Sequence, residues 1–101
     1  MKFEEGKIYV LKFNSGEEMI AKVTHVWTDV DRITVSNPVS IAPGPKGMQM
    51  IPSLLTADQD MGVVVNISAI AMYTTPDHNI RDSYITATTG IQLPAKQIIL
   101  G

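Results

Sequence analysis

Alternation of apolar and polar residues with a period of two, broken by turn residues, most constrains the fold of this chain. It is clearest in residues 18–27, where the polar Glu18, Lys22 and Thr24 fall on one face, among Ile20 and Val26. The other face of this run carries Met19, Ala21, Val23, His25 and Trp27. A helix would instead place apolar residues three and four positions apart. The pattern predicts a long β-strand and a chain built mainly of sheet.

Turn residues divide the rest of the chain into four more strands. Asn14-Ser15-Gly16 is a turn whose glycine is free to adopt positive φ, and prolines and glycines dominate residues 43–47. Polar connections are expected at residues 28–31 and 58–62. The spacing of these breaks predicts an antiparallel meander of five strands. The predicted strands are residues 7–13, 18–27, 33–41, 48–57 and 63–75.

Pro38 lies inside the third predicted strand. A proline has no amide hydrogen to donate, so within sheets it is confined to edges, bulges and bends. We therefore expect the sheet to curve strongly at this point rather than to run flat through it.

A short helix is predicted after the last strand, over about residues 77–89. Asp77 can cap its first turn, and Gly90 is expected to end it. One side of this helix carries Ile80, Tyr84 and Ile85. We expect this side to dock on the sheet. Residues 90–101 are too short for a further core element, so they form either a mobile tail or a strap on a neighbour.

The length and composition of the chain favour one domain. With 101 residues, of which 45% are hydrophobic, one core can close but not two, because a domain needs roughly 100 residues to bury enough surface. We expect a single domain over residues 1–101, with its core at about 7–75. The predicted fold class is all-β: a strongly bent five-stranded antiparallel sheet, a small open barrel, with a short C-terminal helix.

The cysteine content and the net charge limit the cellular compartment and the binding partners that we expect. The chain has no cysteine, which removes disulfides and thiolate sites and fits a reducing compartment, so a cytoplasmic location is expected. Its start lacks the apolar run of a secretory peptide, and no stretch approaches the ~20 apolar residues of a membrane span. The net charge of −2 gives no general attraction to phosphate, so any nucleic-acid binding must be local.

The sequence shows no catalytic centre. Its two histidines, His25 and His78, lie on different predicted elements, and no HExxH motif, Ser-His-acid order or phosphate-binding glycine loop is present. Asp58 and Asp60 begin like a calcium loop, but the later ligands and the closing glutamate are missing. A solvated hairpin turn is favoured there. We expect a protein that is not an enzyme and that needs no cofactor and no metal.

His25 and Trp27 each have two interpretations. His25, expected to face inward, could be a metal ligand or could stack on a base, but a single histidine on a mixed face is more often packed and hydrogen-bonded. Trp27 lies beside a polar turn, where an aromatic ring can stack on a nucleobase or close the end of a barrel. Packing is favoured for both, and Trp27 is kept as a candidate binding residue.

Residues 10–23 resemble the first motif of the Sm/LSm (Hfq-like) superfamily. This motif begins with an apolar strand and a turn glycine. The third residue after that glycine is apolar, the fifth is small and the seventh is apolar. Those places are filled by Gly16, Met19, Ala21 and Val23. The family has glycine where Ala21 stands. Residues 66–71 resemble the second motif in its bacterial form, a polar trio followed by Ala-Ile and a strand that leads to Pro76. The resemblance covers roughly residues 7–75 and is comparable to that of divergent, phage-borne Sm-like proteins.

The resemblance implies a homo-oligomeric ring in which the exposed edges of strands four and five pair between subunits. It also implies that the turns before strands three and five face a central pore and contact single-stranded RNA or DNA. Residues 29–32 replace the family's Asp-x-x-x-Asn loop, and the basic residue of the second motif is absent. The candidate nucleic-acid contacts are Trp27, Asp29, Asp31, Arg32, Asn66 and Ser68.

The leading hypothesis is therefore an Sm-like ring that binds single-stranded nucleic acid and acts in its processing or protection. Because Asp29 and Asp31 repel phosphate, binding should be weak and salt-sensitive. The rival is a structural or adaptor ring that scaffolds protein partners without binding nucleic acid, and the missing basic residue favours it. A small hydrolase or metal enzyme would require His25 or the Asp58/Asp60 pair to meet partners that the spacing does not show.

Overall fold

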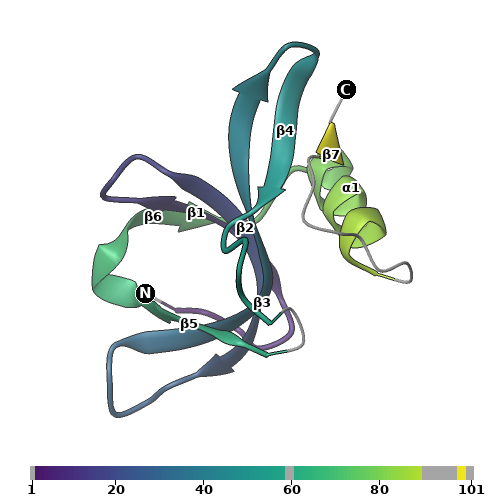
Figure 1. Ribbon diagram of the computed structural model, residues 1–101. Coiled ribbons are helices and arrows are strands. Elements are labelled where there is room, and N and C mark those ends of the chain that lie inside the picture. The colour runs from purple at the N-terminus through teal and green to yellow at the C-terminus, as the bar shows by residue number, and fades with distance from the viewer. Residues whose placement is uncertain (1, 59–60, 90–97, 100–101) are drawn as a thin grey trace.

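The computed structural model describes residues 2–58, 61–89 and 98–99. This part of the chain forms seven strands, one α-helix and one short 3₁₀-helix, η1 (Figure 1). The strands are β1 (Ile8–Phe13), β2 (Glu18–Val26), β3 (Arg32–Gly44), β4 (Gly47–Pro52), β5 (Val63–Asn66), β6 (Ile70–Thr74) and β7 (Ile98–Ile99). The helices are η1 (Ile67–Ala69) and α1 (His78–Thr88).

One antiparallel sheet contains all the strands, in the order β6-β1-β2-β3-β4-β7, and β5 also pairs with β3. The long strand β3 shapes this sheet because it has two partners along one edge. Residues Arg32–Val35 pair with β5, whereas Val39–Gly44 pair with β4. The sheet is open rather than closed. The predicted all-β class with one short C-terminal helix is confirmed.

β3 bends between its two pairing segments. Asn37 has a φ of 48°, in the left-handed region that asparagine adopts more readily than most residues. On the β2 side the pairing shifts between Ile20 and Lys22. Pro38 follows Asn37 directly and so lies at this bulge. The prediction that a proline without an amide hydrogen marks a bulge or a bend is confirmed.

Six strands precede the helix, so the predicted count of five was wrong. The predicted strand over 63–75 divides at η1 into β5, which pairs with β3, and β6, which pairs with β1. Backbone bonds stabilise this corner: Ile67 N–H donates to the Asp31 carbonyl at 3.0 Å, and Asn14 N–H donates to the Ala69 carbonyl at 2.8 Å. Val65, Ile67 and Ala69 alternate with the polar Asn66 and Ser68 through the corner, so the sequence pattern there is that of an unbroken strand.

A second bulge reverses the predicted orientation of His25 and Trp27. Val23 and His25 pair with consecutive residues of β3, so Thr24 between them has no partner in that strand. The extra residue shifts the alternation by one position, which leaves Val23 buried and exposes both aromatic side chains. The predictions that His25 faces inward and that Trp27 lies on the same face as Val23 were wrong, because alternation presumes an unbroken ladder of strand pairs.

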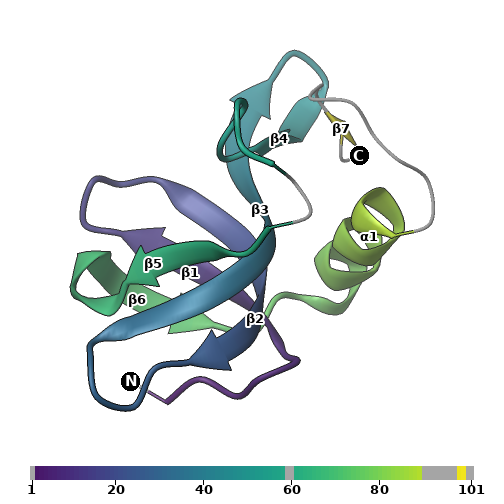
Figure 2. The same ribbon diagram turned by 60° about the horizontal axis from the view of Figure 1, so that its bottom comes forward.

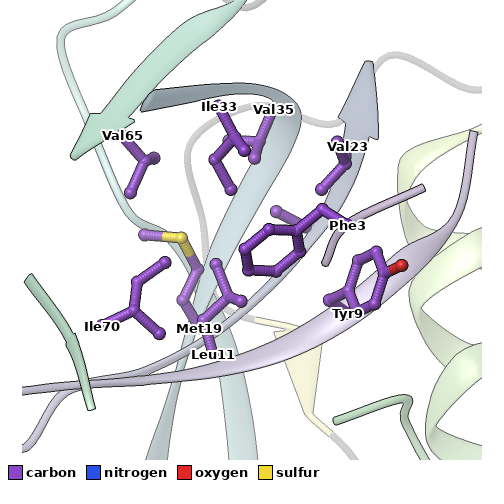
Figure 3. Packing of buried hydrophobic residues seen from close by; sticks show 10 residues of the cluster. Phe3, Tyr9, Leu11, Met19, Val23, Ile33, Val35, Val65 and Ile70 are labelled. Atoms are coloured by element: carbon purple, nitrogen blue, oxygen red, sulfur yellow. The ribbon is translucent and has the colours of Figure 1, made fainter. Parts of the chain in front are cut away.

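The inner face of the curved sheet encloses the main core, whose tightly packed side chains are shown in Figure 3. Phe3 joins this core from the N-terminal strap, residues 2–6, and lies edge-on to Tyr9 with ring centroids 5.0 Å apart. Its ring centroid is 4.7 Å from that of Tyr73. The buried residues are Phe3, Tyr9, Leu11, Met19, Ala21, Val23, Ile33, Val35, Val65 and Ile70.

A second, smaller core lies between the sheet and α1, which is set to one side of the strands in Figures 1 and 2. Its buried residues are Ile20, Val39, Met50 and Tyr84, with Ile8, Val10, Ile41, Ile80 and Ile85 packed against them. β1 and β2 therefore bury side chains on both faces. This explains why residues 8–11 and 19–21 are continuously apolar instead of alternating.

α1 is fixed at its start and along its buried side. The Asp77 side chain accepts the Asn79 N–H at 2.7 Å, which is the predicted cap. The Tyr84 hydroxyl lies 3.1 Å from the Ser36 carbonyl and 2.9 Å from the Asn37 carbonyl, to which it donates. Burial raises the pKa of the Tyr84 phenol well above its usual value, so the neutral form is favoured.

Part of the predicted C-terminal tail pairs with its own chain. In β7, Ile98 and Ile99 pair antiparallel with Met50 and Gln49 of β4. The rest of the tail and the predicted helix end at Gly90 lie outside the described residues. Within the described part of the chain, no helix has the length and apolar character needed to cross a membrane.

Candidate functional site

Three connections gather along the side of the molecule that lies away from α1, as Figures 1 and 2 show. They are the β1–β2 turn, the β2–β3 connection and η1. The backbone bonds of Asp31 with Ile67 and of Asn14 with Ala69 join the three. The candidate residues at 27–32 and 66–68 lie at these connections, so the folded chain brings together two groups that are distant in sequence.

Arg32 and Asn66 form the closest side-chain contact between the two groups. They are directly opposed where β3 pairs with β5, and Arg32 Nε–H donates to Asn66 Oδ1 at 3.2 Å. Both side chains are exposed. A guanidinium has five N–H donors, so this bond holds Arg32 in place while most of its donors stay available.

Trp27 lies beside this pair. Its N–H donates to the Arg32 carbonyl at 3.1 Å, and its indole Nε1–H donates to Thr34 Oγ1 at 3.1 Å. Arg32 and Thr34 are on the same face of β3, because the buried Ile33 between them points inward. The indole therefore lies on the outer face of the sheet, 42% exposed, on the same side as the Arg32 guanidinium.

Asp29, Asp31 and Ser68 are exposed, and two of them hold the turns through their backbones. Asp29 Oδ1 accepts the hydroxyl of its neighbour Thr28 at 3.2 Å. The carbonyl of Asp31 accepts the bond from Ile67, and the carbonyl of Ser68 accepts Asn14 Nδ2–H at 3.0 Å. The side chains of Asp31 and Ser68 are therefore left to solvent or to a ligand.

A hollow of about 360 Å³ opens between the β1–β2 turn and β5. Apolar residues form part of its lining, and polar groups of the turn and of Asn66 form the rest. It is lined by Phe13, Asn14, Ser15, Glu17, Met19, Val64, Val65, Asn66 and Ala69. The volume suits a planar ring or one large side chain.

Sequence reasoning missed Asn14 and Glu17 as neighbours of the site. Both look like ordinary turn residues, and the partners that place them are distant: Asn14 bonds to Ser68, and Glu17 accepts the hydroxyl of Ser40. The only available signal was the polar turn itself, which marks a turn in many proteins. Their place beside Asn66 depends on the pairing of β1 with β6 and of β3 with β5.

The charges around the site are mixed. Arg32 is flanked by the exposed carboxylates of Asp29 and Asp31, and Glu17 lines the nearby hollow. Exposed charges interact weakly and are screened by salt. Among the residues that the structure describes, no group of three or more His, Cys, Asp or Glu could hold a metal ion. Asp60 of the calcium-like turn lies outside those residues.

A scan against protein-family models finds no match to this chain, and a search of curated proteins finds no significant match. The proposed function therefore rests on the residues themselves and on their arrangement.

Proposed function

We propose that this protein is an Sm-like homo-oligomeric ring that binds single-stranded RNA or DNA and acts in its processing or protection, without a catalytic centre or a cofactor. The observation that carries the proposal is the bond between Arg32 and Asn66, which joins the two turns that the family resemblance assigns to nucleic-acid contact. Trp27 on the same outer face supports it.

These three side chains supply the chemistry that single-stranded recognition needs. The guanidinium of Arg32 can hold a phosphate or stack on a base. The Asn66 amide uses its oxygen for Arg32, which leaves its Nδ2–H donors for the edge of a base. The exposed indole of Trp27 offers a surface for stacking, which tolerates any base.

The free edges of the sheet support assembly into a ring. Among the described residues, β5 pairs only with β3 and β6 only with β1, so each strand has an unpaired edge. Val64 on β5 and Met72 on β6 are exposed apolar side chains. β4, which is the fourth predicted strand, pairs with β7 at Gln49 and Met50, so we place the interface at β5 and β6 and not at strands four and five. Pairing of β5 in one subunit with β6 in the next would satisfy both edges, and a head-to-tail contact of this kind can close a ring.

The test is fluorescence anisotropy with labelled oligo-U, oligo-A and single-stranded DNA at low and at physiological salt. We expect saturable binding at low salt, and a loss of about tenfold or more in the double variant Arg32→Ala/Asn66→Ala. The matched control is Arg81→Ala/Asn79→Ala, which removes the same residue types from the exposed surface of α1. Binding that is unchanged in the first variant would contradict the proposed site.

The second candidate function is an adaptor ring that holds protein partners. The carboxylates of Asp29 and Asp31 beside Arg32 favour it, because they oppose the approach of phosphate. Under this alternative the chain assembles but binds none of the three oligonucleotides, even at low salt. The anisotropy measurement thus decides between the two functions.

A further inference from the structure

Beside the Arg32–Asn66 pair, the bulge at Thr24 turns two aromatic rings outward. The rings of His25 and Trp27 are perpendicular, at 89°, with centroids 4.8 Å apart. The His25 side chain is 53% exposed. Neither residue belongs to the core inside the sheet, so the bulge places this pair on the surface.

Polar contacts at the ring edges hold this pair. His25 Nδ1 lies 3.3 Å from Glu5 Oε2, and the same carboxylate oxygen accepts the Val26 N–H at 3.2 Å. Trp27 donates its indole N–H to Thr34 Oγ1. Because these contacts use ring-edge nitrogens, ring faces remain available to a ligand.

Glu5 can act in this way because the N-terminal strap is itself anchored. Phe3 is buried in the core, and Gly6 N–H donates to the Val23 carbonyl at 2.7 Å. Glu5 lies between these two anchors. Its carboxylate is therefore kept at the end of β2, beside His25.

Two perpendicular rings in contact form a corner that fits a third planar ring. In such a pair, one ring presents its edge to the face of the other. A third ring can stack on the first and meet the face of the second with its own edge. A nucleobase has the required planar shape and stacking surface, and it is accessible in a single strand.

We propose that His25 and Trp27 form a corner that stacks one unpaired nucleobase of a single-stranded nucleic acid, with Glu5 as the positioning residue that orients the imidazole. This inference rests on the proposed function and adds a base-stacking site to it. Arg32 lies two residues before Thr34 on β3, about 7 Å along the strand. It is therefore placed to hold a phosphate next to the stacked base.

Charges of both signs surround this corner. The strap contributes Glu5 and a Glu4–Lys7 pair joined at 2.8 Å, and β3 contributes Arg32. The β2–β3 connection adds the exposed carboxylates of Asp29 and Asp31. The residue of β3 that pairs with His25 is the neutral Thr34. Because the carboxylates oppose the approach of phosphate, stacking supplies most of the affinity of this corner.

The experiment measures affinity for labelled oligo-U, oligo-A and single-stranded DNA by anisotropy at low salt. The protein is the full chain, with circular dichroism to establish folding. We expect His25→Ala to lose about 5- to 150-fold in affinity, the range for removing one stacked base. His25→Phe keeps a planar ring for stacking, so it should bind within a few-fold of wild type.

The matched control is His78→Phe, which changes the other histidine of the chain. This residue is at the exposed start of α1, so the variant should bind as wild type. Glu5→Gln should keep the fold and weaken binding by several-fold. The chain has one tryptophan, so quenching of its fluorescence by unlabelled oligonucleotide reports stacking at Trp27 directly.

Two results separate the failure of this inference from that of the proposed function. If His25→Ala binds as tightly as wild type while Arg32→Ala/Asn66→Ala loses binding, the base-stacking corner is wrong and the nucleic-acid role stands. If wild type binds none of the oligonucleotides, the proposed function and the corner are both overturned.

Discussion

The phenol of Tyr84 connects α1 to the bend of β3, and its loss should have a measurable cost. In Tyr84→Phe the ring still fills the second core, but the carbonyls of Ser36 and Asn37 lose their donor. Leaving buried acceptors unpaired costs about 1–2 kcal/mol of unfolding free energy. Urea unfolding at pH 7 measures this. An unchanged midpoint would mean that water replaces the hydroxyl without cost.

The same residue should control stability at alkaline pH. The folded state raises the pKa of Tyr84, whereas the unfolded chain has the ordinary tyrosine pKa of about 10. The stabilisation that the protonated Tyr84 phenol gives the folded state is therefore complete below about pH 10. It is lost as the pH rises above that value, because only the unfolded state readily releases the proton. Wild type should lose stability in this range more steeply than Tyr84→Phe. The control Tyr73→Phe retains Tyr84 and should follow wild type.

At the scale of elements, the N-terminal strap behaves as part of the core although it forms no strand. Phe3 packs on Tyr9 and Tyr73 and is 8% exposed. Phe3→Ala should lower the free energy of unfolding by about 3–5 kcal/mol, the usual cost of emptying a buried aromatic site. Lys2→Ala is the control, because its side chain is exposed and its backbone N–H to Tyr73 remains. Chemical denaturation gives the unfolding midpoints of Phe3→Ala and Lys2→Ala. Equal midpoints would contradict the role of Phe3 in the core.

Local pattern predicted the elements but not the corners between them. Period-two alternation and turn residues located the strands, and the missing amide hydrogen of Pro38 located the bulge in β3. Alternation failed at Thr24 and at η1, because the bonds that stabilise such irregularities come from other strands. Phe3 has no periodic neighbours to mark it as buried.

The candidate site was predictable only as a set of residues. Arg32 and Asn66 were both singled out, but they are 34 positions apart, and only the pairing of β3 with β5 places them in contact. The orientation of His25 depended on one unpaired residue in β2. The sequence thus indicated which side chains are candidates for the site. The bulges and the strand pairing determine which of these side chains are in contact.

At the scale of the whole molecule, the proposed ring has two different faces, one at β5 and one at β6. Val64 is 54% exposed and Met72 is 64% exposed, so an aspartate at either position should disturb the fold by less than about 1 kcal/mol. Either substitution should nevertheless break every interface of the ring. We expect wild type to show a solution mass several times that of the 11.0 kDa chain by light scattering, and each variant to show the mass of one chain.

Mixing the two variants tests the head-to-tail arrangement itself. Val64→Asp keeps an intact β6 face and Met72→Asp keeps an intact β5 face, so one copy of each should form a single interface and stop at a heterodimer. A symmetric contact between like faces would give a different result, because a variant that keeps the contacting face intact would dimerise with its own copies before any mixing. Thr86→Asp, on the exposed surface of α1, should assemble as wild type. A wild-type mass equal to one chain would remove the ring, and binding of nucleic acid would then have to be explained by a single subunit.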